Sequence, residues 1–320
     1  MSSVVFVDKS FGKPTRLATP ALSCNQFLLG DVCLPEGEFN MKAKIITAFL
    51  ALTLATLACG SNIDLPKAPT PGSDIVDEIT VPVPKTDEVS LRLAFGVGEM
   101  TLGPGAKKLV EGTATYNYAA FKPKVNIDGG NVQIQMSKVD SIPSFDNLKN
   151  NWDLKLGETP MDLTIESGAY DGTFEFGGLA LNNLTIKDGA ANVELTFSES
   201  NLVEMSTFRY ETGASNVKMS GLANANFDIF DFSSGAGDYT LDFSGELQRD
   251  ASIKISSGFS NIIVVIPEDV DAVVTVDSGA SNVNAGSNWK KNGDVYKQKG
   301  EGPTLTFVIE IGAGNVTLTK

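Results

Sequence analysis

A four-residue motif recurs at nearly constant spacing from residue 168 to the C-terminal end of the chain. It begins with glycine, continues with alanine or phenylalanine, and closes with asparagine or aspartate three positions after the glycine. Successive glycines are separated by 21, 24, 22, 23, 21 and 33 residues. An internal period of this length is typical of chains built from small stacked units. The glycines are Gly168, Gly189, Gly213, Gly235, Gly258, Gly279 and Gly312.

Apolar and polar residues alternate on both sides of the motif. Two examples are "NLTIKDGAANVELTF" at 183–197 and "LTFVIEIGAGNVTLT" at 305–319. Alternation with a period of two predicts β-strands. We expect the glycine to supply a positive φ and the asparagine or aspartate to tolerate left-handed geometry, which makes the motif a tight turn. Each unit is therefore predicted to be strand, turn, strand.

The predicted fold is all-β, with stacked strand-turn-strand repeats of about 22 residues in a solenoid-like body. Units of this size bury only one face and must stack to be stable. A sandwich of separate hairpins is the alternative arrangement. A final strand pair within 304–319 is expected to close the stack. The stacked turns would form a structural ladder on one edge, made of Asn192, Asn216, Asp238, Asn261, Asn282 and Asn315.

The rest of the chain divides by composition. Residues 59–89 contain five prolines and scattered charges, so we expect a tether that holds the folded part away from a membrane. Residues 90–185 have less regular strand signals and are predicted to be an irregular N-terminal β domain. Residues 186–320 are the repeat domain, either separate from it or continuous with it.

Residues 41–58 have the organisation of a lipoprotein signal peptide. A basic start at Met41 is followed by an uncharged apolar run over 45–58. This run is too short to span a bilayer but suits a signal peptide. It ends before Cys59, and its last residues resemble the lipobox of bacterial lipoproteins, whose cysteine is lipidated and becomes the mature N-terminus. We expect lipidation at Cys59, and an ordinary secretory signal is the alternative.

A signal peptide that starts at Met41 leaves residues 1–40 unexplained. We expect translation to start at Met41 and residues 1–40 to be an upstream extension outside the protein. Cys24 and Cys33 lie in that extension, so only Cys59 remains after the signal peptide. No disulfide framework is then expected.

The composition excludes several kinds of chemistry. The chain contains no histidine, which excludes histidine-based triads and general bases. The 39 acidic and 25 basic residues give a net charge of −14. Such a surface repels nucleic acid and anionic lipid head groups, so we expect no nucleic-acid partner and membrane attachment only through the lipid. No cofactor or metal is expected.

An acidic stretch at 226–245 offers the strongest candidate for chemistry. Paired carboxylates could hydrolyse glycosidic bonds, and several oxygens could bind Ca²⁺. The simpler interpretation places the acids on the outer side of strands whose apolar residues, Phe227, Ile229, Phe232, Tyr239, Leu241 and Phe243, face the core. The acids are Asp228, Asp231, Asp238 and Asp242.

Several segments together support a family assignment: 95–99, 151–154, 160–163, 221–225, 235–237 and 241–245. With these segments, residues 91–320 resemble the toast-rack domain proteins, grouped with LiaF-like cell-wall-active antibiotic response proteins. The resemblance implies an all-β, extracytoplasmic or membrane-associated protein. LiaF-type relatives carry transmembrane helices and restrain a sensor kinase, whereas this chain has a lipobox instead. The resemblance supplies no catalytic or ligand-binding residues.

We therefore predict a lipid-anchored, extracytoplasmic, non-enzymatic β-protein. It would be an interaction or structural module of the cell envelope, with an envelope protein or a glycan as partner and envelope-stress signalling as one role. The alternative is a carbohydrate-active β-solenoid enzyme or a glycan-binding adhesin. A groove with convergent carboxylates and a basic residue would favour the enzyme, and dispersed charge would favour the module.

Overall fold

The computed structural model describes residues 71–137 and 147–320. The expected extension (1–40), the signal peptide (41–58) and Cys59 lie outside the described residues. Residues 67–320 cluster into one compact unit. The described part contains two short 3-10 helices, η1 (Ala119–Phe121) and η2 (Leu222–Ala225). Its strands are β1 (Ile75–Val81), β2 (Ser90–Pro104), β3 (Val110–Tyr116), β4 (Pro123–Asp128), β5 (Asn131–Met136), β6 (Asn150–Leu156), β7 (Met161–Glu175), β8 (Leu181–Thr196), β9 (Met205–Ser220), β10 (Phe227–Asp242), β11 (Ala251–Val265), β12 (Asp271–Ala285), β13 (Lys290–Asn292), β14 (Val295–Gln298) and β15 (Thr304–Thr319).

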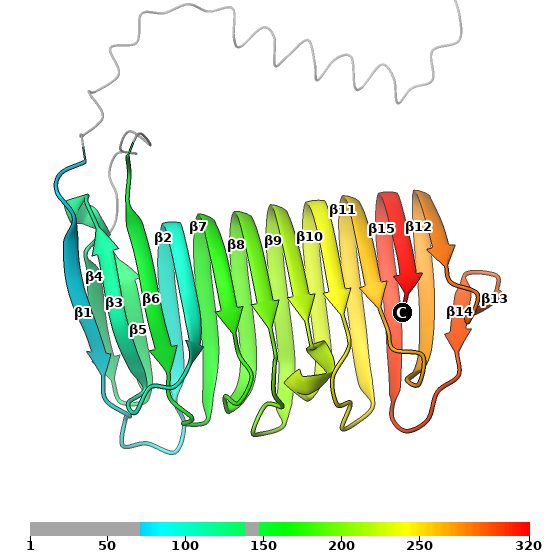
Figure 1. The fold of residues 1–320 in the computed structure, drawn as a ribbon, viewed down its shortest axis with the longest axis horizontal. Helices are drawn as coiled ribbons and strands as arrows, with labels where there is room; N and C mark the ends of the chain where they lie inside the picture. The colour runs from blue at the N-terminus through cyan, green and yellow to red at the C-terminus, as the bar shows by residue number, and fades with distance from the viewer. Residues whose placement is uncertain (1–70, 138–146) are drawn as a thin grey trace, which may run out of the picture. The chain divides into compact units, whose positions relative to one another are not determined.

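The fold is all-β, and the predicted stacking of similar units is confirmed. Fifteen strands form one sheet, in which the long strands lie side by side as a row (Figure 1). From β2 to β12 every neighbouring pair of long strands is parallel. The sheet is a long stack rather than two sheets of separate hairpins.

Each long strand is bent at its motif glycine, so that its two halves face each other. Phe232 and Tyr239 are separated by seven positions in β10, which corresponds to about 23 Å in a straight strand. Their ring centroids are only 4.9 Å apart. Phe230 and Phe243, near the two ends of the same strand, have centroids 6.0 Å apart. The single sheet thus folds over and encloses its own core.

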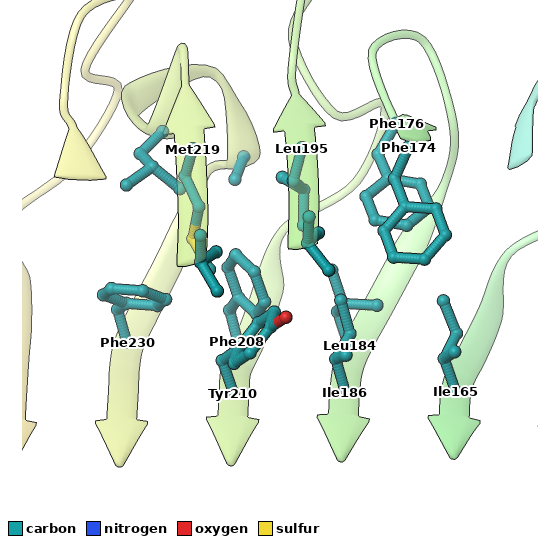
Figure 2. Packing of buried hydrophobic residues seen from close by; sticks show 14 of the residues in the cluster. Ile165, Phe174, Phe176, Leu184, Ile186, Leu195, Phe208, Tyr210, Met219 and Phe230 are labelled. Carbon is teal, nitrogen blue, oxygen red and sulfur yellow. The ribbon is translucent and has the colours of Figure 1, made fainter. Parts of the chain in front are cut away.

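The core consists of side chains that point inward from both halves of each strand. In β9, Phe208 and Tyr210 precede the bend, Val217 and Met219 follow it, and all four are at most 2% exposed. Figure 2 shows how such residues from neighbouring strands fill the space between the two halves. Aromatic rings continue from strand to strand, for example Phe208 against Phe230 at 4.9 Å. Burial of these residues supplies the main driving force for folding.

The predicted tight turn is wrong in one respect, because the strand continues through the motif. In the β9–β10 pair, Ser234 pairs with Thr212 and Ala236 pairs with Ala214, one on each side of the glycine. The backbone therefore stays in a parallel ladder while it bends. Alternating side chains report which face a residue occupies, but they do not show whether the ladder is interrupted.

The reason for the motif glycine also differs from the prediction. None of the seven motif glycines is among the described residues with positive φ. A Cβ atom on Gly213 would instead lie 2.4 Å from the carbonyl oxygen of Gly189, and one on Gly235 would lie 2.5 Å from that of Gly213. Glycine is needed because neighbouring bends pack backbone against backbone.

The last strand in the sequence does not close the stack, contrary to the prediction. β15 lies between β11 and β12, and it pairs in parallel with both (Figure 1). Leu305, Phe307 and Ile309 of β15 are fully buried. β12, which ends in the less apolar Val283-Asn284-Ala285, occupies the outer position instead. An interior strand is covered on both sides and therefore suits the more apolar sequence. This explains why β15, and not β12, occupies the interior position.

The N-terminal end of the stack is closed on both halves of β2. The first half of β2 pairs with β5, which pairs with β4. The second half pairs with β6, and β3 and β1 continue this layer as antiparallel strands. Trp152 of β6 is 1% exposed and packs edge-on against Phe95 of β2, with centroids 5.1 Å apart. This irregular region is therefore a cap for the repeats.

Two predicted boundaries do not match the structure. The tether was expected to extend to residue 89, but residues 75–81 form β1, in which Ile79 and Val81 are buried. Apolar alternation within this segment decides its structure, because the neighbouring prolines flank the strand without interrupting it. The boundary at 185/186 falls inside β8, and the regions on either side share one core.

Candidate functional site: the corner and its two outward faces

The bend divides the outer surface of the stack into two faces. We call the four residues from motif glycine to motif asparagine or aspartate the corner. The charged face comprises the outward residues before the corner, and the amide face comprises the outward residues from the last corner residue onward. Because the strands stack in register, each position forms a row of side chains about 4.8 Å apart.

Charged residues of opposite sign alternate across the charged face. Lys187 lies 3.2 Å from Glu211, and Arg209 lies 3.3 Å from Asp231. Farther along the stack, Lys254 and Glu310 are 3.3 Å apart. These pairs are solvent-exposed, so water and salt screen them and each contributes little to stability. Their effect is to order a row of charges rather than to hold the fold together.

A shallow groove of about 500 Å³ follows the charged face across β8 to β11. It contains both carboxylates and basic side chains, as a carbohydrate-active enzyme would require. The hydrogen bond from Arg92 lowers the pKa of Glu166, and the hydrogen bond from Lys254 lowers that of Glu310. A general acid for glycoside hydrolysis needs a raised pKa. Neither of these two carboxylates has the raised pKa of a general acid, and both lie outside the lining of the groove. The groove is lined by Lys187, Asp188, Arg209, Glu211, Thr212, Asp231, Ser233, Lys254 and Ser256.

The amide face carries the predicted ladder residues, joined by side-chain hydrogen bonds in two runs. In the first run Asn216 donates to Asn192 (3.1 Å) and Asn192 donates to Asp171 (2.8 Å). The second run begins at Asp238, and its bonds join neighbours in spatial rather than sequence order. Its donor–acceptor pairs are Asn261 to Asp238 (2.8 Å), Asn315 to Asn261 (2.7 Å) and Asn282 to Asn315 (3.4 Å). The position of β15 explains why Asn315 lies between Asn261 and Asn282.

Phe259 interrupts the otherwise smooth corner. Six of the seven motifs have alanine after the glycine, but β11 has phenylalanine. The Phe259 side chain is 68% exposed, and Ile263 on the amide face of the same strand is 39% exposed. An exposed aromatic ring beside a row of amides is a feature of binding surfaces rather than of a core.

A partly buried polar cluster lies beneath the corner of β8 and β9, and it was not predicted from the sequence. The Asp188 carboxylate accepts hydrogen bonds from the Tyr210 hydroxyl (2.7 Å) and from Thr212. Ser215 donates to the same carboxylate at 3.2 Å and accepts from the Ala191 N–H at 2.9 Å. Burial raises the pKa of the Tyr210 hydroxyl well above its usual value. The only sequence signal was the polar residue that precedes six of the seven motif glycines; Ile311 precedes the seventh.

The four aspartates of the 226–245 stretch do not converge. Asp228 pairs with Arg249, Asp231 with Arg209, and Asp238 with Asn261, while Asp242 accepts from the backbone N–H of Ser244 at 2.8 Å. In the described part of the chain no three acidic or cysteine side chains come close enough to hold a metal ion.

The core assignment in that stretch was wrong at one position. Ile229 was expected to face the core but is 48% exposed, and Phe230 is buried in its place. Two consecutive exposed residues, Asp228 and Ile229, shift the alternation at the start of β10.

Comparison with known proteins identifies the family of the first part of this fold. Residues 70–220 match the family described as the N-terminal domain of toast_rack, DUF2154. This match confirms the predicted toast-rack resemblance for residues 70–220. No curated protein matches the chain in sequence. Neither helix of the described residues is long and apolar enough to cross a membrane.

Solved structures with partial similarity come from several bacteria. A proposed cell adhesion protein from Clostridium sporogenes shares 19% identity with a TM-score of 0.42, over 77% of this chain and 99% of that chain. A proposed adhesin from Parabacteroides merdae shares 13% identity with a TM-score of 0.34, over 80% of this chain and 100% of that chain.

Proposed function

We propose that the chain is a lipid-anchored extracytoplasmic protein that binds other envelope molecules through the outer surface of its strand stack, without catalysis. The observation that supports it is the ordered row structure of the two faces. The charged face offers alternating, mutually paired charges, and the amide face offers hydrogen-bonded amides. Such surfaces recognise extended partners through many weak contacts.

The anchor is part of the same proposal. The apolar run before Cys59 and the basic residues ahead of it support export and lipidation. An acidic chain of net charge −14 is repelled by an anionic bilayer, so the lipid has to supply the attachment. A role in envelope-stress signalling would make a sensor kinase the partner.

Glycan binding is the second candidate function, and Phe259 favours it. Its exposed ring could stack on the apolar face of a sugar, while Asn261 and Asn315 beside it offer amide groups for sugar hydroxyls. Loss of glycan binding in Phe259→Ala, with Ala236→Ser as a corner control, would support this candidate over a protein partner.

The proposed function is tested by capturing partners from membranes. The lipidated protein would be cross-linked in its native membrane, purified, and compared with a charged-face variant, Lys187→Glu/Arg209→Glu/Lys254→Glu. A matched control on the amide face is Asn192→Ser/Asn216→Ser/Asn261→Ser. We expect a specific partner whose recovery falls at least about tenfold in one of the two variants, because each removes a whole row of contacts.

Two outcomes would contradict the proposal. Turnover of a glycan by the purified protein, without any recovered partner, would make the protein an enzyme. A Cys59→Ala protein that is lipidated and retained in membranes like the wild type would remove Cys59 as the anchor.

A further inference from the structure

The outermost long strand, β12, is paired with β14 along only the first part of its length. β14 pairs with β12 over Ala272–Thr275, and the Val276 N–H donates to Asp294 at 3.0 Å. Among the described residues, the backbone from 277 to 285 pairs with β15 alone. We call this stretch, residues 277–285, the open edge. The open edge contains the corner of β12 and the second half of the strand.

The open edge lacks the features that usually protect an unpaired strand. Natural edge strands are blocked by prolines, inward charges, bulges or a covering segment. Here the sequence "DSGASNVNA" contains no proline and only one charged residue, Asp277. Val283 is partly exposed, whereas Val217 at the same position of β9 is 2% exposed. Core residues at this end therefore lack the neighbour that covers them elsewhere.

Backbone donors of this edge point away from the stack. The Gly286 N–H donates to Leu318 of β15 at 3.1 Å. Because successive N–H groups of a strand point to opposite sides, those of Ala285 and Val283 are directed to the open side. The Ser281 hydroxyl is also buried without a hydrogen-bond partner among the described residues. The backbone of another strand could pair with these groups, since it supplies hydrogen-bond donors and acceptors at matching spacing.

The corner restricts which sequences can pair here. Within the stack, six of the seven motif glycines lie against the carbonyl oxygen of another motif glycine, and an added Cβ would come within 2.4–2.7 Å of that oxygen. Gly168 lies in the same way against Gly96, at 2.9 Å. A parallel strand that crosses the corner beside Gly279 meets the same crowding. Such a strand needs glycine at that position.

The surroundings of the open edge have the opposite charge from the rest of the chain. Residues 287–299, which form the loop and hairpin beside it, contain four exposed lysines and one acidic residue. The whole chain has a net charge of −14. A parallel strand would run from this hairpin toward the corner. Its residue two positions before the glycine would lie beside Asp277, so a basic residue is favoured there, while acidic residues farther ahead would lie near these lysines. The lysines are Lys290, Lys291, Lys297 and Lys299.

We propose that the open edge of β12 is a strand-addition site for an extended segment of a partner protein, with a basic residue two positions before a glycine. This proposal rests on the proposed interaction role but assigns it to the end of the stack rather than to its faces. The added strand would extend the parallel sheet by one member and would cover Val283.

The probe is a synthetic peptide with the sequence of residues 211–219 and the change Glu211→Lys, KTGASNVKM, whose first lysine lies beside Asp277 when Gly213 lies beside Gly279. We expect this peptide to bind the purified protein in a fluorescence-polarisation titration. The same peptide with the change Gly213→Val should bind at least about tenfold more weakly because of the corner crowding. Thermal unfolding of the protein should shift upward in the presence of the first peptide only.

The matched protein variants are Ala285→Pro and Ala285→Val. Proline removes an outward N–H without breaking a bond to β15, so the fold should remain while peptide affinity falls about tenfold or more. Valine keeps the N–H and should bind like the wild type. Circular dichroism and the unfolding temperature verify that both variants are folded.

Equal binding of the two peptides, or equal binding by the two variants, would overturn the proposal. A dimer in light scattering that Ala285→Pro dissociates would identify a second copy, and not a partner protein, as the occupant. If Ala285→Pro leaves recovery of a membrane partner unchanged and no peptide binds, the edge proposal fails while the proposed function stands.

Discussion

The two ends of the strand stack are built differently. At the N-terminal end, β2 is covered over both halves, by β5 on one and by β6 on the other. At the C-terminal end, β14 covers only the first part of β12. Each interior strand is paired on both sides by neighbours with the same corner. An end strand has such a neighbour on one side only, so other segments must cover its second side. The closed end covers both halves of its strand, whereas residues 277–285 of β12 pair only with β15 among the described residues.

The largest expected difference between the ends comes from removing a core aromatic at the closed end. Trp152→Ala deletes a side chain that is 1% exposed and packs against Phe95. We expect a loss of about 3–5 kcal/mol in the free energy of unfolding, measured by urea denaturation. A loss below 1 kcal/mol would show that the cap contributes little to stability.

Next in size is a change at an interior corner. Gly213→Val places a side chain against the backbone of Gly189, where even a Cβ would lie at 2.4 Å. We expect a destabilisation of about 1–3 kcal/mol or more, since backbone cannot move aside cheaply. Ala214→Val is the control, because the next position points outward and β11 carries Phe259 there. Similar destabilisation by both changes would contradict the backbone-crowding account.

A smaller effect compares the same strand position in the interior and at the open end. Val217→Ala removes methyl groups that are 2% exposed and should cost about 2 kcal/mol. Val283→Ala removes a partly exposed side chain and should cost less than about 1 kcal/mol. The two unfolding curves test the comparison directly. Equal losses would mean that residues 277–285 are covered in solution.

The remaining comparison concerns pH dependence, to which Tyr116 at the closed end contributes. Burial, together with the nearby Asp77 carboxylate, raises the pKa of Tyr116 in β3 to about 12. An unfolded tyrosine ionises near pH 10, so this contribution is complete below about pH 10 and is lost as pH rises toward 12. Tyr116→Phe should flatten that part of the stability curve, by at most about 1.4 kcal/mol per pH unit. An unchanged slope would place the alkaline sensitivity in other tyrosines.

The sequence was sufficient to predict the all-β stack, because glycine spacing and alternating apolar residues report strands and their faces. It did not show that the strand passes unbroken through Gly213, since backbone pairing leaves no mark on side-chain alternation. It did not reveal that β15 inserts before β12, because sequence order is not spatial order. The tether prediction failed at residues 75–81 because proline content outweighed a short alternating pattern.

The candidate surfaces were less predictable than the fold. The rows of Asn192 and Asn216 follow from the repeat, but their partners depend on strand order. The ion pairs across the charged face join residues more than twenty positions apart, so only the register brings Lys187 to Glu211. Nothing in the sequence indicates that residues 277–285 of β12 pair on one side only among the described residues.

The position of β15 has a consequence for how the protein reaches its final state. Its residues 304–319 lie between β11 and β12, so these two earlier strands cannot pair with their shared neighbour until residues 304–319 have been made. A chain cut before residue 304 would lack β15. One edge of β11 and one edge of β12 would then both lose their partner strand. At this end of the stack, the order in which strands are made therefore differs from the order in which they pair.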